Sequence, residues 1–369
     1  MSGSLAGVRV LELGGKGPTP FAGMMLSDMG ADVVVCERVA PAVGEVDVLA
    51  RGKLRMLVDL KSEADRGELE GVLPLFDVVM EGFRPGVAEK LGFGPEQVLA
   101  INPAIVYGRM SGYGQGNSRS GVVGHDLNFI AMSSALAHIG PADRPPAIPL
   151  NLVGDFGGAG MVLTVGILAA LVERSRTGLG QVIDAAMTDA SALLMSSVYG
   201  QRASGQWSDA RESNSVDGGA PFYNVYETAD ERYVAVGALV PDHYRRVLEV
   251  CGIDPDQSPP MDDRAGWPQM RARLAAIFAT RDQAAWVSAF DGVEASFAPV
   301  LTMADVQEHP YHRERESFVD IGGVMQPAPA PRFDRTPSAA RAVVREQFAV
   351  SELLARLGTA STHTDGEQT

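Results

Sequence analysis

Cysteine and positive charge are both scarce in this sequence. Among 369 residues there are two cysteines, Cys36 and Cys251, which are too few for a disulfide framework, and Cys36 lies in an apolar run resembling a β-strand. Two isolated thiols fit a reducing compartment, so we expect a cytoplasmic protein. The 31 lysines and arginines are outnumbered by 46 aspartates and glutamates, which gives a formal charge of −15. This balance argues against a protein dedicated to nucleic acid or anionic membranes, because both partners require a broad basic surface.

Motifs of several common enzyme classes are also absent. The six histidines form no H-x-x-x-H pair with an intervening glutamate, and no cysteine cluster accompanies them, so we expect no metal site. No G-x-S-x-G elbow is present, which disfavours an α/β-type serine hydrolase. The turn after the first expected strand reads Gly14-Gly15-Lys16-Gly17-Pro18, and Pro20 stands where the dinucleotide-binding fingerprint has its third glycine. We therefore expect no nicotinamide cofactor.

The longest charge-free apolar stretch covers residues 156–172. Its 17 residues include four glycines, whereas a membrane-spanning helix needs about 20 apolar residues. Residues 1–7 also lack the cationic segment and apolar core of a signal peptide. We interpret the stretch as a buried core helix and expect no membrane partner.

The first half of the sequence alternates between strand-like and helix-like segments. The expected strands are residues 8–13, 32–37, 56–60, 77–81, 105–109 and 181–186. Such alternation predicts an α/β fold with a mostly parallel sheet wound in βαβ units. After about residue 218 the pattern changes to a hairpin around residues 229–231 followed by helices, which predicts a smaller α+β domain. The proline-rich residues 322–337 are expected to form an extended return across the surface.

Two titratable residues each open an expected helix within a glycine-flanked turn. His125 follows Gly124, and Asp155 lies in the segment from Val153 to Gly158. Each could be a simple cap or packed residue, since aspartate is a common N-cap. A helix N-terminus also offers N–H donors that can stabilise an oxyanion, and an acid/base pair beside such donors suits proton abstraction next to a carbonyl. The residues alone leave both interpretations open.

A series of ordered motifs covers nearly the whole chain apart from its tail. These motifs are residues 5–13, 30–34, 58–62, 81–87, 124–128, 151–158, 180–187, 217–223 and 330–333. In this order they are similar to the motifs of the family III CoA-transferase (CaiB/BaiF) superfamily, and within it they resemble those of the α-methylacyl-CoA racemases. The resemblance implies an isomerase that acts on acyl-CoA thioesters of lipid metabolism.

The resemblance also implies an interlocked homodimer, in which two ring-shaped subunits thread through each other. Each subunit would combine a large Rossmann-like domain with a small α+β domain, and the active site would lie between the large domain of one subunit and the small domain of the other. The implied parts are a large CoA-binding domain (1–190, completed by 325–358), a linker (191–224), a small domain (225–304), a return linker (305–324) and a disordered tail (359–369).

In the racemases, the residues that match His125 and Asp155 transfer the proton at C2 of a 2-methylacyl-CoA. One residue removes the proton, and the other returns a proton to the opposite face of the carbon. The backbone N–H of Asp126 would donate to the thioester enolate oxygen. The resemblance implies that this reaction needs no metal and no cofactor beyond the CoA thioester substrate.

Binding of polyanionic CoA requires local positive charge on this acidic chain. By similarity, Arg38 and Lys61 border the adenine and 3′-phosphate, whereas Arg84 and Lys90 lie nearer the diphosphate. Lys53 stands where the racemases have an arginine, so the charge is kept without the bidentate guanidinium. Further residues expected at the substrate or CoA are Gly82, Phe83, Tyr113 and Phe129. The nearby Met110, Met161, Met187 and Met195 fit either a methionine-lined acyl surface or the core.

One position departs from the racemase pattern and keeps alternatives open. Racemases carry a glutamate that hydrogen-bonds the catalytic histidine across the dimer interface, and here that position is Val240, with Asp242 and His243 close by. One alternative is a CoA transferase in which Asp155 is the nucleophile. Another is a CoA-ester-binding paralogue without turnover. Because the transferases do not need a histidine at position 125, His125 favours the racemase.

Overall fold

The computed structural model describes residues 3–38 and 46–360, and their contacts divide the chain into two compact units. The first unit comprises Met1–Ser133, Leu150–Leu194 and Tyr311–Thr369, and the second comprises Ser134–Pro149 and Met195–Pro310. Most of the expected linker 191–224 therefore groups with the second unit, and most of the expected return linker 305–324 groups with the first. The expected tail lies outside the described residues from residue 361 onward.

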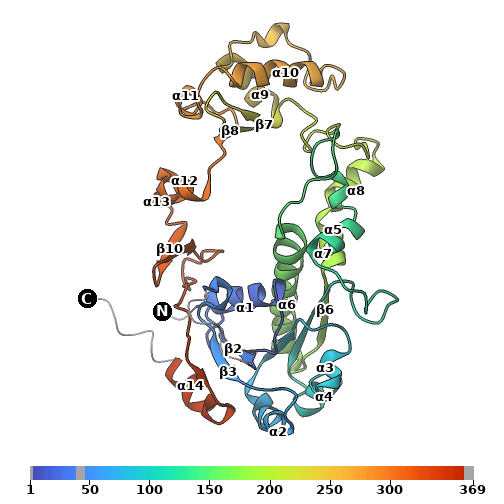
Figure 1. Cartoon of the computed structure of the whole chain (residues 1–369), viewed down its shortest axis with the longest axis vertical. Helices are drawn as coiled ribbons and strands as arrows, with labels where there is room; N and C mark the ends of the chain where they lie inside the picture. Colours follow the sequence, from blue (N-terminus) through green and yellow to red (C-terminus); the bar gives the residue numbers. More distant parts are fainter. Residues whose placement is uncertain (1–2, 39–45, 361–369) are drawn as a thin grey trace, which may run out of the picture. The chain divides into compact units, whose positions relative to one another are not determined.

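A central parallel sheet and the helices beside it form the first unit (Figure 1). The strands of this sheet are β1 (Arg9–Glu12), β2 (Asp32–Glu37), β3 (Leu54–Leu57), β4 (Val78–Glu81), β5 (Val106–Ser111), β6 (Val182–Ala186) and β12 (Gln347–Phe348). The helices are α1 (Pro18–Asp28), η1 (Val48–Ala50), α2 (Glu63–Val72), η2 (Leu73–Leu75), α3 (Val87–Lys90), α4 (Pro95–Ile101), α5 (Asp126–Met132), η4 (Leu152–Gly160), α6 (Met161–Thr177), α7 (Met187–Leu194), η6 (Val350–Glu352) and α14 (Leu353–Ala360). Helix α13 (Pro310–Glu314) lies at the boundary between the two units.

The strand order of this sheet is β12-β3-β2-β1-β4-β5-β6, and every neighbouring pair is parallel. The predicted α/β fold with a parallel, Rossmann-like sheet is therefore confirmed. From β1 the chain adds strands outward to β3 and then returns to place β4 on the other side of β1. In doubly wound sheets, ligands bind outside the carboxyl ends of the strands at the point where the order reverses. This rule directs attention to the loops that follow β1 and β4.

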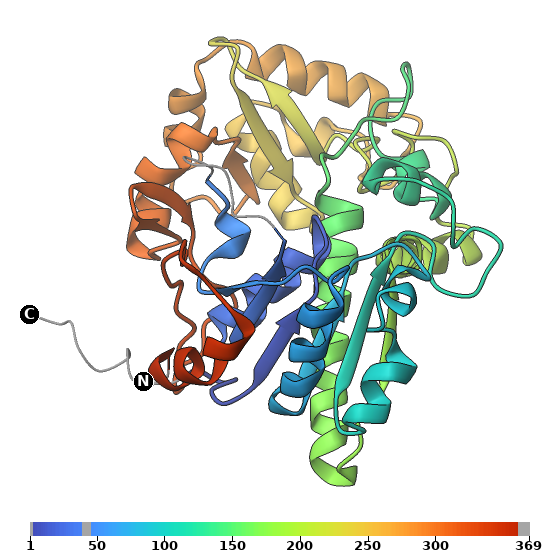
Figure 2. The same cartoon turned by 60° about the horizontal axis from the view of Figure 1, so that its bottom comes forward.

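Alternate residues along the strands face two separate hydrophobic cores. Val10 packs in one core with residues of α1 and α6, whereas Leu11 packs in the other with residues of α2, α4 and α14 (Figures 1 and 2). A parallel sheet covered by helices on both faces is buried throughout, which explains why its strands read as nearly continuous apolar runs.

The structure corrects three sequence-based expectations about local structure. The helix expected to begin near Asp155 begins at Leu152 as the π-helix η4, which continues into α6. The sequence also predicts one helix over residues 187–205, and the structure divides it into α7 and α8 (Ser196–Ala203). The expected extended return, residues 322–337, begins inside a hairpin of β10 (Phe318–Ile321) and β11 (Val324–Pro327), because two glycines with positive φ, Gly322 and Gly323, close a tight turn there.

One helical stretch, Leu152–Thr177, is long and apolar enough to cross a membrane by length and composition, with a mean hydropathy of 1.8. A core helix of a soluble protein can meet the same criterion. Of its most apolar window, 39% is buried in this chain, and Leu163 and Ile167 are fully buried against the sheet. The interpretation as a core helix stays a prediction.

The second unit is built on the antiparallel sheet β7-β8-β9. Strands β7 (Tyr223–Glu227) and β8 (Tyr233–Gly237) form the predicted hairpin, with Glu231 at a φ of 58° in its turn. Aromatic side chains fill the core, where the rings of Tyr226 and Phe278 stack with centroids 5.0 Å apart. The remaining elements are η3 (Leu136–His138), α9 (Pro241–Val250), η5 (Pro255–Gln257), α10 (Trp267–Phe278), α11 (Gln283–Ala289), β9 (Phe297–Pro299) and α12 (Met303–Glu308).

A buried ion pair joins Glu12, the last residue of β1, to Lys53, the residue before β3. The Lys53 ammonium lies 2.7 Å from Glu12 Oε2, and both side chains are 2% exposed. The same ammonium donates to the carbonyl of Pro20 at 2.9 Å. A Cβ on Gly23 would lie 2.4 Å from the Glu12 carboxylate, so the bare backbone of α1 makes room for the pair. This placement does not fit the predicted contact of Lys53 with CoA, because the ammonium is enclosed and already paired.

We expect Lys53→Met to destabilise the protein by about 3–5 kcal/mol, because it leaves the Glu12 carboxylate buried without its partner. The double variant Lys53→Met/Glu12→Leu should recover most of this loss, since an apolar pair needs no compensating charge. Urea unfolding measures both changes. The exposed pair Arg202–Asp209 supplies the control, and Arg202→Ala should have a much smaller effect. A Lys53→Met effect no larger than that of Arg202→Ala would contradict this account.

Candidate functional site

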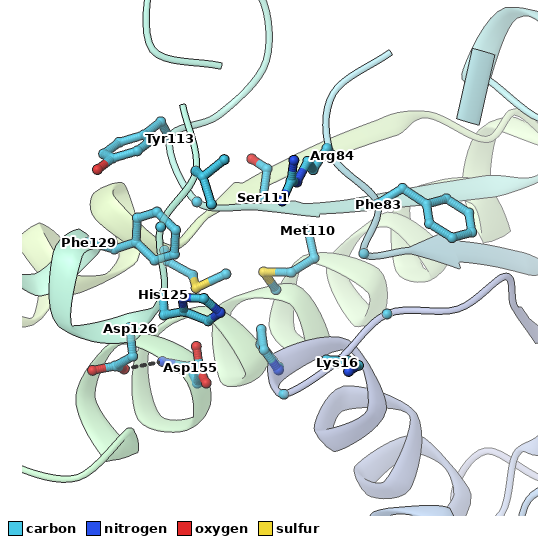
Figure 3. A pocket seen from close by; sticks show the side chains of 18 of the residues that line it. Lys16, Phe83, Arg84, Met110, Ser111, Tyr113, His125, Asp126, Phe129 and Asp155 are labelled. Atoms are coloured by element: carbon cyan, nitrogen blue, oxygen red, sulfur yellow. Dashed lines mark hydrogen bonds between the residues drawn. The ribbon is translucent and has the colours of Figure 1, made fainter. Parts of the chain in front are cut away.

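A pocket of about 480 Å³ lies at the carboxyl ends of four neighbouring strands of the first unit. Its walls come from the loops after β1, β4 and β5, from the start of α5, and from Asp155 and Met187 (Figure 3). The first two of these loops flank the reversal of the strand order, where a doubly wound sheet binds its ligands. The pocket therefore occupies the place that the fold predicts.

His125 lines this pocket at the start of α5. The Asn128 side chain accepts a hydrogen bond from the His125 backbone N–H at 3.1 Å, and the imidazole makes no capping hydrogen bond. His125 is therefore the N-cap residue of α5 by position, as the cap interpretation expected, while its imidazole lines the pocket. The backbone N–H of Asp126 has no partner among the described residues, as is usual in a first helical turn, and can donate to a ligand in the pocket.

Asp155 lines the same pocket from the first turn of η4. The N-cap position of this helix is Asn151, so the interpretation of Asp155 as the N-cap is wrong. The Asp155 carboxylate accepts a hydrogen bond from Asn151 Nδ2 at 3.0 Å. The backbone N–H of Asp155 donates to Asp126 Oδ1 at 2.7 Å (Figure 3). A Cβ on Gly17 would lie 2.9 Å from Asp155 Oδ2, so the glycine-rich turn after β1 closes directly against this carboxylate.

The surroundings of Asp155 favour its protonated form. Partial burial raises the pKa of Asp155 above its ordinary value, and the charge of Asp126 acts in the same direction. The hydrogen bond from Asn151 and the charge of His125 oppose this rise in the pKa. A carboxyl group whose pKa is raised toward neutrality is better suited to both donating and accepting a proton.

Buried charges behind the pocket anchor the loop that carries Arg84. At the end of β4, the Glu81 carboxylate accepts from the Phe83 backbone N–H at 2.7 Å and from Arg109 Nε at 2.9 Å. Arg109 also pairs with Glu89 at 2.8 Å. Burial raises the pKa of Glu81 despite these partners. Glu81 and Arg109 were not predicted as supports of this loop, because their pairing depends on the neighbouring registers of β4 and β5.

Apart from the buried Lys53, the predicted substrate-contacting residues divide into two groups. Gly82, Phe83, Arg84, Tyr113 and Phe129 line the pocket together with His125, Asp126 and Asp155. The Tyr113 and Phe129 rings meet edge to face with centroids 5.0 Å apart. The second group, Arg38, Lys61 and Lys90, is exposed and does not line the pocket. Their predicted contacts with CoA stay predictions.

Several other residues complete the pocket lining. Lys16 lines the pocket from the turn after β1, although its sequence context indicated only an incomplete dinucleotide-binding fingerprint. Of the methionines near the motifs, Met110 and Met187 line the pocket, and Met161 and Met195 do not. Across residues 3–38 and 46–360, no group of three or more histidine, cysteine, aspartate or glutamate side chains could hold a metal ion.

Comparison with known proteins identifies the family. The model of CoA-transferase family III matches residues 5–346. The chain belongs to this family. It is 44% identical over 335 residues to the alpha-methylacyl-CoA racemase of Mus musculus, covering 90% of this chain and 87% of the mouse protein. It is 40% identical over 336 residues to the alpha-methylacyl-CoA racemase of Homo sapiens, covering 91% and 88% of the two chains.

The solved structures agree with the fold. A CaiB/BaiF family protein from Brucella suis superimposes with a TM-score of 0.81 and covers 98% of this chain and 100% of its own. Its sequence identity is 23%, so this similarity supports the architecture and says nothing of the reaction. The family resemblance stated from the sequence motifs is thereby confirmed.

We expect Asn151→Ala to raise the pKa of Asp155 further, because the amide hydrogen bond stabilises the ionised carboxylate. The titration midpoint, followed by NMR of ¹³C-labelled aspartate carboxyl groups, should move to higher pH. The resonance is assigned by its loss in Asp155→Asn. An unchanged or lower midpoint in Asn151→Ala would contradict the described electrostatics.

Proposed function

We propose that this chain is an α-methylacyl-CoA racemase that interconverts the epimers of 2-methylacyl-CoA thioesters. The observation that carries the proposal is that His125 and Asp155 line one pocket of a family III chain closely similar to named racemases. The two side chains face the same space beneath Met110 in Figure 3. An imidazole and a carboxyl group around a single carbon are the groups that a two-base proton transfer requires.

In the proposed reaction, one of these two groups removes the proton from C2 of the thioester. The electron pair of the broken C–H bond forms the C1–C2 double bond of an enolate, and negative charge moves to the thioester oxygen. The free N–H of Asp126 donates to that oxygen. The other group then gives its proton to the opposite face of C2, which restores the thioester with inverted configuration. His125 and Asp155 exchange roles in the reverse direction.

The CoA part of the substrate would follow the loops at the carboxyl ends of the strands. Arg84 stands in the pocket wall on the loop anchored by Glu81, and we assign it to the diphosphate. Exposed Lys90 would join Arg84 at the diphosphate, and exposed Arg38 and Lys61 would hold the 3′-phosphate and the adenine. We propose that the reaction uses no cofactor or metal, and that the enzyme works in the cytoplasm.

The test is to incubate the protein with one epimer of a 2-methylacyl-CoA in D₂O and to follow C2 deuteration and epimerisation by NMR. Wild-type protein should deuterate C2 with loss of stereochemistry. His125→Ala and Asp155→Ala should each lower the rate of racemisation by about 10²–10⁴-fold, as expected for loss of a general acid or base.

A transferase would give a different result in the same experiment. It would show no C2 exchange, would move CoA to an added carboxylate, and would lose activity with Asp155→Ala but keep it with His125→Ala. Tight acyl-CoA binding without exchange or transfer would indicate a binding paralogue. Either result would overturn the proposed racemase.

We further propose an interlocked homodimer. Several apolar side chains of the first unit are exposed in the single chain, among them Val165 and Val172 on α6 and Leu193 and Leu194 on α7. A second subunit would cover such a surface. In this arrangement the partner's small domain would bring Val240 toward His125. The nearby His243 already has a partner for its ring within the second unit, because its Nδ1 lies 2.8 Å from Ser296 Oγ.

Sedimentation should therefore give twice the chain mass of 39.0 kDa. Because threaded rings cannot separate while folded, dilution should not yield a folded monomer. A stable, folded species of one chain mass would contradict the interlocked dimer.

A further inference from the structure

The side chain of Asp126 has no role in the reaction described so far. It is 5% exposed and accepts the Asp155 backbone N–H on Oδ1 at 2.7 Å. Its second oxygen, Oδ2, is buried without a hydrogen-bond partner among the described residues. No lysine or arginine of the described part of the chain forms an ion pair with it. Burying a carboxylate oxygen without a hydrogen-bond partner costs free energy of folding, so stabilisation of the fold alone does not explain Asp126 at this position.

The backbone around Asp155 is shaped to accept this carboxylate. A Cβ on Gly154 would lie 2.5 Å from Asp126 Oδ1, so a bare backbone is needed for the close approach. Asp155 lies in the first turn of η4, where backbone N–H groups lack acceptors within their own helix. Asp126 supplies the missing acceptor from a different helix. One residue thus begins α5 and also caps η4.

We propose that the Asp126 carboxylate is a positioning residue, which fixes the Asp155 peptide to the start of α5 so that Asp155, His125 and the Asp126 N–H keep one mutual geometry. This inference rests on the proposed racemase reaction and deepens it. The Asp126 backbone would hold the enolate oxygen while its side chain holds the proton-transfer carboxyl group. Because both contacts come from one residue, the group that holds the enolate oxygen and the group that transfers a proton at C2 keep a fixed distance and orientation.

The charge of Asp126 adds an electrostatic effect to this positioning. Negative charge close to Asp155 raises the pKa of that carboxyl group, and His125 opposes the rise. The other elements packed on η4 carry Asp28 at the far end of α1, the exposed Asp189 on α7, and Glu173, Arg174 and Arg176 near the far end of α6, and Lys16 lies in the turn before α1. The charges that act on Asp155 are those of Asp126 and His125.

Two substitutions separate the positioning from the charge. Asp126→Asn keeps an oxygen acceptor for the Asp155 N–H and removes the negative charge, whereas Asp126→Ala removes both. Neither changes the backbone N–H of residue 126. Asp189→Asn is the matched control, since it removes one carboxylate from a helix packed on η4 without touching Asp155.

For Asp126→Asn we expect a lower pKa of Asp155, because the neighbouring negative charge that raised it is gone. The ¹³C carboxyl titration of Asp155 and the acidic limb of the pH profile of kcat should both move to lower pH. Asp126→Ala should show the same direction of shift and should lower kcat about tenfold or more beyond Asp126→Asn, since a buried N–H loses its acceptor. KM should change less than kcat in both variants. Asp189→Asn should match wild type in every measurement.

The outcomes distinguish this inference from the proposed function. If wild-type protein does not exchange C2 hydrogen, the racemase proposal fails, and the carboxyl titration of Asp155 in Asp126→Asn still decides whether the charge of Asp126 acts on Asp155. An unchanged Asp155 titration in Asp126→Asn would overturn this electrostatic effect. Equal loss of kcat in Asp126→Asn and Asp126→Ala would overturn the positioning role. Because Asp126→Asn is isosteric, it keeps the test decisive if Asp126→Ala does not fold.

Discussion

One hydrogen bond, 2.7 Å from the Asp155 peptide to the Asp126 carboxylate, joins the two helices that carry the reactive side chains. The chain between these residues leaves the first unit and returns to it, because Ser134–Pro149 groups with the second unit. Sequence proximity therefore does not hold His125 and Asp155 together. Their common position depends on a contact between α5 and η4, and this contact uses a side-chain oxygen of residue 126 and the bare backbone of Gly154.

Buried charge supports the two loops that face this pair. Glu12 at the end of β1 is paired with Lys53, and Glu81 at the end of β4 is paired with Arg109. Both carboxylates stand at the point where the strand order reverses, directly before the loops that line the pocket. Buried pairs of this kind contribute little net stability, but losing one partner is costly. We infer that they fix the loops in place rather than strengthen the fold as a whole.

Five strands of the parallel sheet and the start of α5 were predictable because their signals are local: apolar runs for the sheet and Gly124-His125-Asp126 for the helix. Strand β3 begins two residues before the expected strand 56–60, and the short β12 was not expected. Lys53 was misplaced because a lysine in sequence gives no sign of the glutamate 41 positions away that buries it. Asp155 was misjudged as a possible N-cap because a π-helix spaces its first turn differently from an α-helix. The hairpin of β10 and β11 was missed because its prolines favoured an extended segment, although Gly322 and Gly323 supplied the turn.

The central claim is that His125 and Asp155 act on opposite faces of one carbon. The most direct measurement is C2 deuteration of each epimer separately by His125→Gln and Asp155→Asn in D₂O. Our account predicts that each variant, although unable to racemise, still exchanges the C2 hydrogen of one epimer, and that the two variants select opposite epimers. Exchange of both epimers by either variant, or of the same epimer by both, would contradict the two-face arrangement.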